Sequence, residues 1–281
     1  GTIGVGDGAG DMVVSGSELQ LITAGSLTIG GANTTAVTVD GVTNADTANI
    51  ARLVTLDAGE ITFSGAASTF GSLQADAAGP IVVAADLSTH AGGLALTGGS
   101  IAFSGGRTVE SLGDMTLTAG GGIQSQGDLV LRAAGATSDL SVKSAMDVDG
   151  ALTIGAGRNV MIAADTSSTG AAAIRADLTG GGTGTITIAS GVTLSTADAG
   201  ITLSADGLVL DGWVNSGSAA TTIRRSAAGT IGVGDGAGDL SLSRDELARI
   251  TAASLDVGGT NTTGIDVSGV TLDDLANIRG L

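Results

Sequence analysis

The feature that most constrains this chain is a long internal repeat. Residues 1–53 and 229–281 align without a gap, and 33 of the 53 aligned positions are identical. The opening segment GTIGVGDGAGD recurs letter for letter from Gly229 to Asp239. We therefore expect residues 1–228 to form one full unit of a tandem array. Residues 229–281 are expected to begin the next unit, continuous with the first.

A shorter rhythm runs through the long unit. Apolar–small–apolar triplets recur along the chain, and glycine-rich segments separate them. Alternation with a period of two, rich in β-branched residues, indicates short strands with one buried face. The triplets begin at Leu27, Val37, Ile61, Ile81, Leu94, Ile101, Met115, Leu129, Leu140, Leu152, Ile186, Ile201 and Leu208.

Large side chains are scarce, which limits the ways in which such strands can be buried. The chain has 49 glycines but only three Phe, one Trp and no Tyr. Strands of three to five residues gain a core by stacking coil on coil, where aliphatic side chains form continuous columns and glycine turns the corners. The prediction is an all-β fold, a right-handed parallel β-helix (β-solenoid) of roughly 10–13 coils. An up-and-down barrel is the alternative, and it requires longer strands and hairpin turns.

A helical turn interrupts the strand pattern at three places. A small polar or acidic residue is followed by Leu and, three residues later, by Ile, in residues 17–22, 245–250 and 273–278. This pattern is typical of a capped single turn of helix. We expect each segment to make a corner in the path of the strands.

Composition also excludes several classes of function. The chain has no Cys, so disulfides and thiolate metal sites are excluded. A formal charge of −17, spread along the chain, disfavours binding to nucleic acid or to anionic lipid. No apolar run is long enough to form a membrane helix, so membrane insertion is not expected.

One part of the sequence resembles a known family. The phrase SELQLITAGSLTIGG, its partner DELARITAASLDVGG and the following NTT and strand are similar to repeats of filamentous-haemagglutinin-like, two-partner-secretion exoproteins. The resemblance covers both copies of the 53-residue segment. Residues 54–228 are similar only in their general pattern of short apolar triplets and glycine-rich turns. It implies a right-handed β-helical fibre, secreted or on the bacterial cell surface, that serves adhesion or matrix architecture.

Two glycine-rich motifs suggest binding chemistry. The segment from Gly4 to Ala9 satisfies a loose GxGxxA dinucleotide pattern, but a strand-like sequence follows it where a phosphate-binding helix is required. The same segment resembles one calcium-binding nonapeptide, which makes Asp7, Asp11, Asp235 and Asp239 candidate calcium ligands. That mechanism uses nonapeptides in tandem, so solvated corner carboxylates are the simpler interpretation, and no cofactor is expected.

Catalytic chemistry is difficult to assemble from this sequence. His90 is the one histidine, and we expect it in an exposed loop without the elbow that a nucleophilic serine needs. Polysaccharide-cleaving enzymes need clustered carboxylates, for which the best candidates are Asp198, Asp206 and Asp211 near Trp213. The prediction is that the chain is not an enzyme and has no catalytic residues.

The sequence therefore predicts a structural and adhesive segment of an extracellular bacterial fibre. Its expected partner is a host or neighbouring-cell surface or a glycan. Self-association end to end is a further prediction, because strand edges at the ends of a coil stack lack partners. A glycan-binding module is the second function considered, with Trp213 as the contact, and a β-helical polysaccharide-cleaving enzyme is the third.

Overall fold

The computed structural model describes residues 1–280, and these form two compact units. Unit 1 contains residues 1–135 and 143–145, and unit 2 contains residues 136–142 and those from 146 onward. Both are built from short strands, and each has one helix of four residues among its described residues. Every strand pairing that is described below is parallel. The prediction of an all-β, parallel fold is therefore confirmed.

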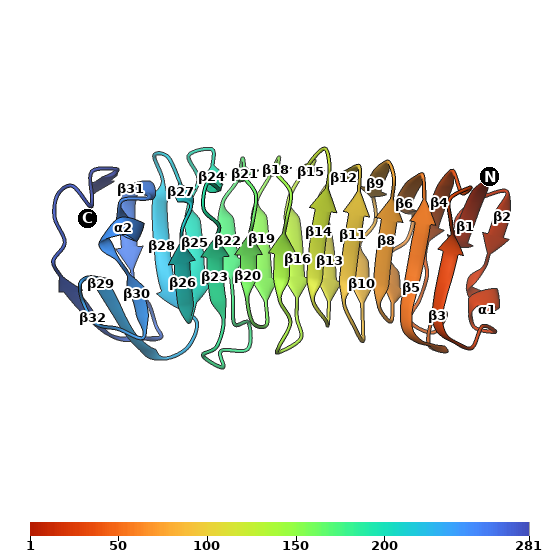
Figure 1. Ribbon diagram of the computed structural model, residues 1–281, viewed down its shortest axis with the longest axis horizontal. Helices are drawn as coiled ribbons and strands as arrows, with labels where there is room; N and C mark the ends of the chain where they lie inside the picture. Colours follow the sequence, from red (N-terminus) through yellow and green to blue (C-terminus); the bar gives the residue numbers. More distant parts are fainter. Residues whose placement is uncertain (281) are drawn as a thin grey trace. The chain divides into compact units, whose positions relative to one another are not determined.

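Unit 1 has three parallel sheets, and most of their strands are labelled in Figure 1. The first holds, in order of pairing, β2 (Met12–Val14), β1 (Thr2–Gly6), β4 (Ala36–Asp40), β6 (Glu60–Ser64), β9 (Pro80–Val83), β12 (Ser100–Phe103) and β15 (Ile123–Ser125). The second holds β7 (Ser68–Phe70), β10 (Leu87–Thr89), β13 (Arg107–Ser111) and β16 (Leu129–Ala133). The third holds β3 (Ala24–Gly30), β5 (Ile50–Ala58), β8 (Leu73–Ala77), β11 (Leu94–Gly98) and β14 (Met115–Ala119).

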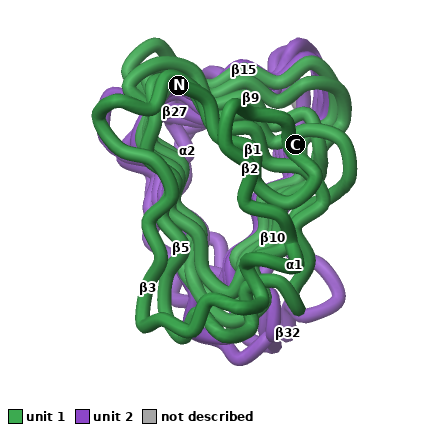
Figure 2. The backbone as a smooth tube through the Cα atoms, turned by 90° about the vertical axis from the view of Figure 1, so that its right-hand side faces the viewer, with its two compact units in different colours: residues 1–135, 143–145 green, residues 136–142, 146–281 purple. Residues whose placement is uncertain are grey.

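In unit 1 the chain visits the three sheets in turn. It passes from β6 to β7 and β8, and then returns to the first sheet as β9, which pairs with β6. Equivalent residues consequently stack: Ile61 lies beside Ile81, Ile81 beside Ile101, and Ile101 beside Ile123. The intervals are 20, 20 and 22 residues, which is the length of each of these coils. Figure 2 looks along unit 1, so its successive turns overlie one another in green.

The core of unit 1 consists of the inward side chains of these strands. Alternate residues are buried, and the isoleucine column and three phenylalanines are almost fully covered. Glycine is needed where strand and turn meet closely: Gly6 has φ +69°, and a Cβ there would lie 2.2 Å from the Asp40 carbonyl oxygen. Stacking of small coils therefore explains both the aliphatic and the glycine-rich parts of the composition.

Unit 2 repeats this plan, with its strands paired in three rows and one small sheet. One holds β18 (Met146–Val148), β21 (Thr166–Ser168), β24 (Thr193–Thr196), β27 (Trp213–Asn215) and β31 (Ile250–Val257). A second holds β19 (Leu152–Ala156), β22 (Ala172–Arg175), β25 (Ile201–Ala205) and β28 (Ala220–Arg225), followed by β31 again and β33 (Ile278–Gly280). A third holds β17 (Leu140–Val142), β20 (Val160–Ile162), β23 (Thr185–Ile188) and β26 (Gly207–Leu210). A small sheet holds β30 (Leu240–Leu242), β29 (Gly229–Gly234) and β32 (Thr262–Ser268).

The helical turns occur at two of the three predicted places. They are α1 (Gly16–Leu19) in unit 1 and α2 (Arg244–Leu247) in unit 2. Each begins one residue earlier than the pattern indicated, because Ser15 and Ser243 are the N-caps of capping boxes with Glu18 and Glu246. Residues 273–277 instead form successive turns with hydrogen bonds between residues three apart, and Ile278 begins β33.

Candidate functional site

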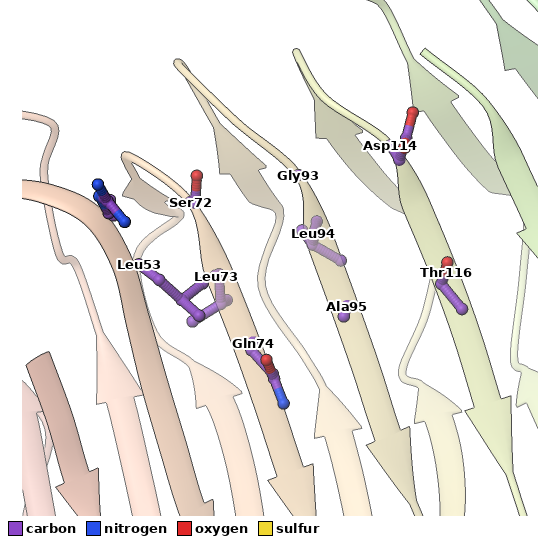
Figure 3. A pocket seen from close by; sticks show the side chains of 10 residues that line it. Leu53, Ser72, Leu73, Gln74, Gly93, Leu94, Ala95, Asp114 and Thr116 are labelled. Carbon is purple, nitrogen blue, oxygen red and sulfur yellow. The ribbon is translucent and has the colours of Figure 1, made fainter. Parts of the chain in front are cut away.

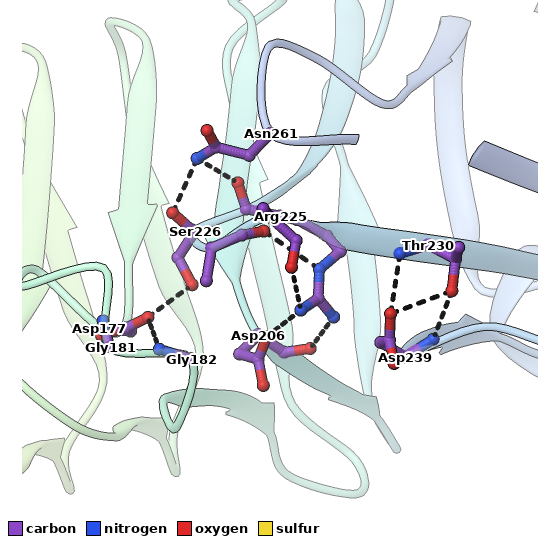
Figure 4. Close-up of polar contacts among 11 residues, drawn as sticks. Asp177, Gly181, Gly182, Asp206, Arg225, Ser226, Thr230, Asp239 and Asn261 are labelled. Carbon is purple, nitrogen blue, oxygen red and sulfur yellow. Dashed lines mark hydrogen bonds and ion pairs between the residues drawn. The ribbon is translucent and has the colours of Figure 1, made fainter. Parts of the chain in front are cut away.

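Two of the four calcium candidates tie a strand to the turn that follows it. Asp11 accepts a hydrogen bond from the Thr2 backbone N–H at 2.9 Å, and its own N–H donates to Thr2 Oγ1. Asp239 accepts from the N–H and the hydroxyl of Thr230 at 2.8 and 3.0 Å, as Figure 4 shows. In both cases the Thr backbone hydrogen bond is the main cause that lowers the carboxyl pKa. These carboxylates have a structural role in the turn.

The other two candidates, Asp7 and Asp235, are exposed residues that directly follow β1 and β29. Their backbone N–H groups donate to the carbonyl oxygens of Asp40 and Ser268, at 2.8 and 2.7 Å. Within residues 1–280, no three acidic or histidine side chains gather in a way that could hold a metal ion. Calcium binding by the four aspartates stays a prediction that the geometry does not test.

The dinucleotide-like segment lies in a turn between two strands. β1 covers its first residues, and the chain then turns into β2, with α1 starting only at Gly16. A Cβ on Gly4 would lie 1.9 Å from the Gly8 carbonyl oxygen. The glycines therefore allow the turn to fold back on its own strand.

The residues considered for catalysis have other contacts. Contrary to expectation, His90 is half-buried after β10, and its Nδ1 is shielded from solvent. Asp198 accepts a hydrogen bond from the Ser218 N–H at 2.7 Å, which fixes a turn. Asp206 forms an ion pair with Arg225, whereas Asp211 is exposed.

Unit 2 contains a buried polar cluster that the sequence pattern did not predict (Figure 4). Asp177 is fully buried with φ +58°, and it accepts hydrogen bonds from the N–H groups of Gly181 and Gly182 and from Ser226 Oγ. Burial opposes ionisation of Asp177, but these hydrogen bonds outweigh it and lower its pKa. Asp177 therefore holds the glycine-rich loop 178–184 against Ser226, the residue that follows β28.

Next to Asp177 lies the ion pair of Arg225 and Asp206. The Arg225 side chain is buried, and its guanidinium also donates to the carbonyl oxygens of Ala227 and Ala228. Asn261 Nδ2 donates to the Ser226 carbonyl oxygen at 2.7 Å, which ties the second copy of the repeat to β28 (Figure 4). Because its hydrogen-bonding groups are directed at backbone or at one another, the cluster has a structural role.

Unit 1 carries a shallow groove of about 390 Å³ on the outer face of its third sheet (Figure 3). Ser72, Gly93 and Ala95 are the small residues of its lining, while Arg52 and Asp114 are exposed lining residues. Gln74 adds an amide whose Nε2 donates to Asp76. Such a lining can hydrogen-bond a polar ligand. The signal that could have revealed the groove is a small residue directly before each of two paired strands, Ser72 before β8 and Gly93 before β11.

Trp213 lies at the start of β27 with 48% of its surface exposed, whereas Phe63, Phe70 and Phe103 are at most 1% exposed. The neighbouring Val214 points inward and is buried. The indole thus occupies an outward position, as a contact residue requires. Sequence reasoning singled out Trp213, and the structure places it on an open face.

Comparisons with family models, with curated proteins and with solved structures find no match to this chain. Neither of the two described helices has the length and apolar character needed to cross a membrane. The fold and the contacts above define a class, an all-β protein of stacked parallel strands.

Proposed function

We propose that the chain is a structural and adhesive segment of a bacterial fibre, secreted or held at the cell surface. Its fold in this proposal is a right-handed β-solenoid of roughly 10–13 coils, extended by tandem 228-residue units. The observation that carries the proposal is the in-register stacking of equivalent residues, illustrated by the column Ile61, Ile81, Ile101 and Ile123. We assign it no catalytic role.

The stacking supports a mechanical function for a physical reason. Each coil hydrogen-bonds to its neighbours through three parallel ladders, so that adding coils extends the structure without a new kind of contact. The excess of acidic residues keeps such surfaces soluble and apart. The resemblance to filamentous-haemagglutinin-like exoproteins adds support for secretion and for a host or neighbouring-cell surface as the partner.

Electron microscopy of the native material tests the proposal. About ten coils at 4.8 Å each predict rods with an axial spacing on the order of 50 Å per 228-residue unit. Globular particles without this periodicity would contradict the fibre. Sedimentation of the isolated chain over a concentration series tests whether rods also grow by end-to-end association.

A polysaccharide-cleaving enzyme is the competing function from another class. Incubation of the chain with a panel of polysaccharides, followed by reducing-end and unsaturated-product assays, separates the two. Turnover that Asp206→Asn or Asp211→Asn abolishes would favour the enzyme. Absence of turnover, together with rods in the microscope, would support the structural proposal.

A further inference from the structure

The outward face of β18, β21, β24, β27 and β31 in unit 2 carries an unusual combination of side chains. One outward row runs across these strands and contains only polar residues that can form hydrogen bonds. The register that aligns it is set by the pairing of the five strands (Figure 1). The row consists of Asp147, Ser167, Ser195, Asn215 and Thr251. We call this row, together with Thr193 and Trp213, the Trp213 face.

Trp213 lies beside this row, two residues before Asn215 on the same strand. Its ladder neighbour on β24 is Thr193, which is smaller and leaves the ring accessible from that side. The only tryptophan of the chain thus lies on the surface, although burial of a large ring is the usual way in which it stabilises a fold.

The polar groups of the row are oriented by local hydrogen bonds. Asn215 Oδ1 accepts from the Gly217 N–H at 2.9 Å, which directs the amide nitrogen to the opposite side. Ser167 Oγ donates to Asp147 Oδ1 at 2.7 Å, so the hydroxyl oxygen is left to accept. Pre-oriented donors and acceptors lower the entropy lost when a ligand binds.

We propose that the Trp213 face binds a neutral oligosaccharide, with one sugar ring stacked on the indole and hydroxyl groups bonded to Asn215 and Ser195. A sugar has an apolar C–H face and a rim of hydroxyls, which match an aromatic ring beside groups that both donate and accept. The row spans five strands, about 19 Å at 4.8 Å per step, and so accommodates several rings.

The charges around the face restrict the ligand. Asp147 and Asp165 lie on or beside it, and Arg249 is the cation next to it, with its Nη1 donating to the Leu210 carbonyl oxygen at 2.6 Å. Carboxylates in this setting repel uronate and sulfate groups. An apolar peptide is also a poor match, because a single ring offers much less apolar area than a groove for a helix.

This inference rests on the adhesive part of the proposed function, since it names the surface through which adhesion would act. Failure to bind any glycan would contradict this site but not the proposed fibre, because rods in the microscope report on the stacking of coils alone. Glycan binding in the absence of rods would contradict the proposed fibre and support the glycan site.

The test uses the full chain on an array of neutral and anionic glycans, followed by titration of the neutral hits. Because Trp213 is the only tryptophan, its fluorescence and its protection from iodide quenching report binding at this face directly. We expect neutral glycans to bind, with a change in emission and reduced quenching. Failure of every neutral glycan to bind, or preference for anionic glycans, would overturn the proposal.

Variants locate the site. Trp213→Ala is expected to weaken binding about tenfold, measured by calorimetry, and Asn215→Ala by about three- to tenfold. Met161→Ala is the matched control, because Met161 is a similarly exposed apolar residue on β20, outside the face. It is expected to bind like the unmodified chain. Circular dichroism confirms that each variant is folded, and equal binding by folded Trp213→Ala would overturn the proposal.

Discussion

The two copies of the repeat, residues 1–53 and 229–280, fold alike locally but differ in how far they are buried. In both, the first strand pairs with the short strand that follows it and with the second strand after the helical turn. Val37 and Val39 of the first copy are fully buried, whereas the equivalent Ile265 and Val267 are 48% and 62% exposed.

The difference in burial comes from the strand that covers each of these positions on its second side. β4 of the first copy pairs with β6, whose Ile61 and Phe63 lie beside Val37 and Val39. Among the described residues, β29 is the strand that pairs with β32. Local sequence therefore specifies the strand and its turn, and the neighbouring coil determines the burial of its side chains.

The largest effect on stability is expected when an aspartate is introduced at two equivalent positions of the repeat, one buried and one exposed. Val39→Asp places a carboxylate in the core and should cost about 4 kcal/mol or more of stability. Val267→Asp should change stability by less than about 0.5 kcal/mol, because that side chain is already exposed. Thermal unfolding and hydrogen exchange of β4 and β32 measure both. Similar losses in the two variants would contradict the role given to the neighbouring coil.

A second comparison concerns the capping glutamates. Glu246 Oε2 accepts from the Ser243 N–H, and Glu246 Oε1 also accepts from the Leu210 N–H of β26 at 3.0 Å. Glu246→Ala is therefore expected to lower stability by about 2 kcal/mol. Among the described contacts, the Glu18 carboxylate bonds only to Ser15 of its own cap. Glu18→Ala should therefore lower the stability by less than Glu246→Ala does. Denaturant titration of both variants checks the order, and a larger loss for Glu18→Ala would reverse the argument.

A pH series sharpens the comparison between Asp46 and its equivalent Asp274. Burial raises the pKa of Asp46, but hydrogen bonds from the Thr43 N–H, Gln20 and the Thr43 hydroxyl outweigh it and lower the pKa below the ordinary 3.8. The stability it contributes is thus complete above pH 3.8 and is lost as the pH falls through the lowered value.

Replacement of Asp46 by Asn should cost about 1–2 kcal/mol at pH 7. The difference from the unmodified chain should shrink in acid. Melting temperatures between pH 2 and pH 7 measure it, with Asp274→Asn as the equivalent variant in the second copy, where hydrogen bonds from Thr271 likewise lower the carboxyl pKa. A difference that does not change with pH would show that ionisation of Asp46 is irrelevant to its role.

The smallest effect is expected where the copies differ in sequence. Arg249 stands where the first copy has Leu21, and Arg249 Nη1 donates to the Leu210 carbonyl oxygen. Arg249→Leu should cost about 1 kcal/mol, and the reciprocal Leu21→Arg should lie within about 0.5 kcal/mol. Calorimetric unfolding of the two variants compares them, and a larger effect at position 21 would contradict this assignment.

Much of the fold could be predicted because an aliphatic triplet between glycine turns has few ways to be buried. Each of the thirteen triplets identified from the sequence lies in a strand. Strands such as β21, Thr-Ser-Ser, escaped prediction because their inward residues, Thr166 and Ser168, are polar. Their hydroxyls donate to nearby carbonyl oxygens, so burial is satisfied locally and leaves no apolar signal.

The candidate site was only partly predictable for the same reason. Trp213 could be singled out because it is a rare residue. The polar row beside it is assembled from strands about 20 to 36 residues apart, by a register that no local pattern encodes. Buried Asp177 was likewise hidden, because its partners include Ser226, 49 residues away.

The isoleucine column has a consequence for how such a gene can change. Because Ile61, Ile81 and Ile101 are interchangeable neighbours, removal or duplication of one whole coil joins surfaces that already match. Unequal recombination between coils can therefore lengthen or shorten the molecule by a discrete step while every junction stays compatible. Length becomes a heritable trait that varies separately from the outward residues, and selection can act on reach and on surface chemistry one at a time.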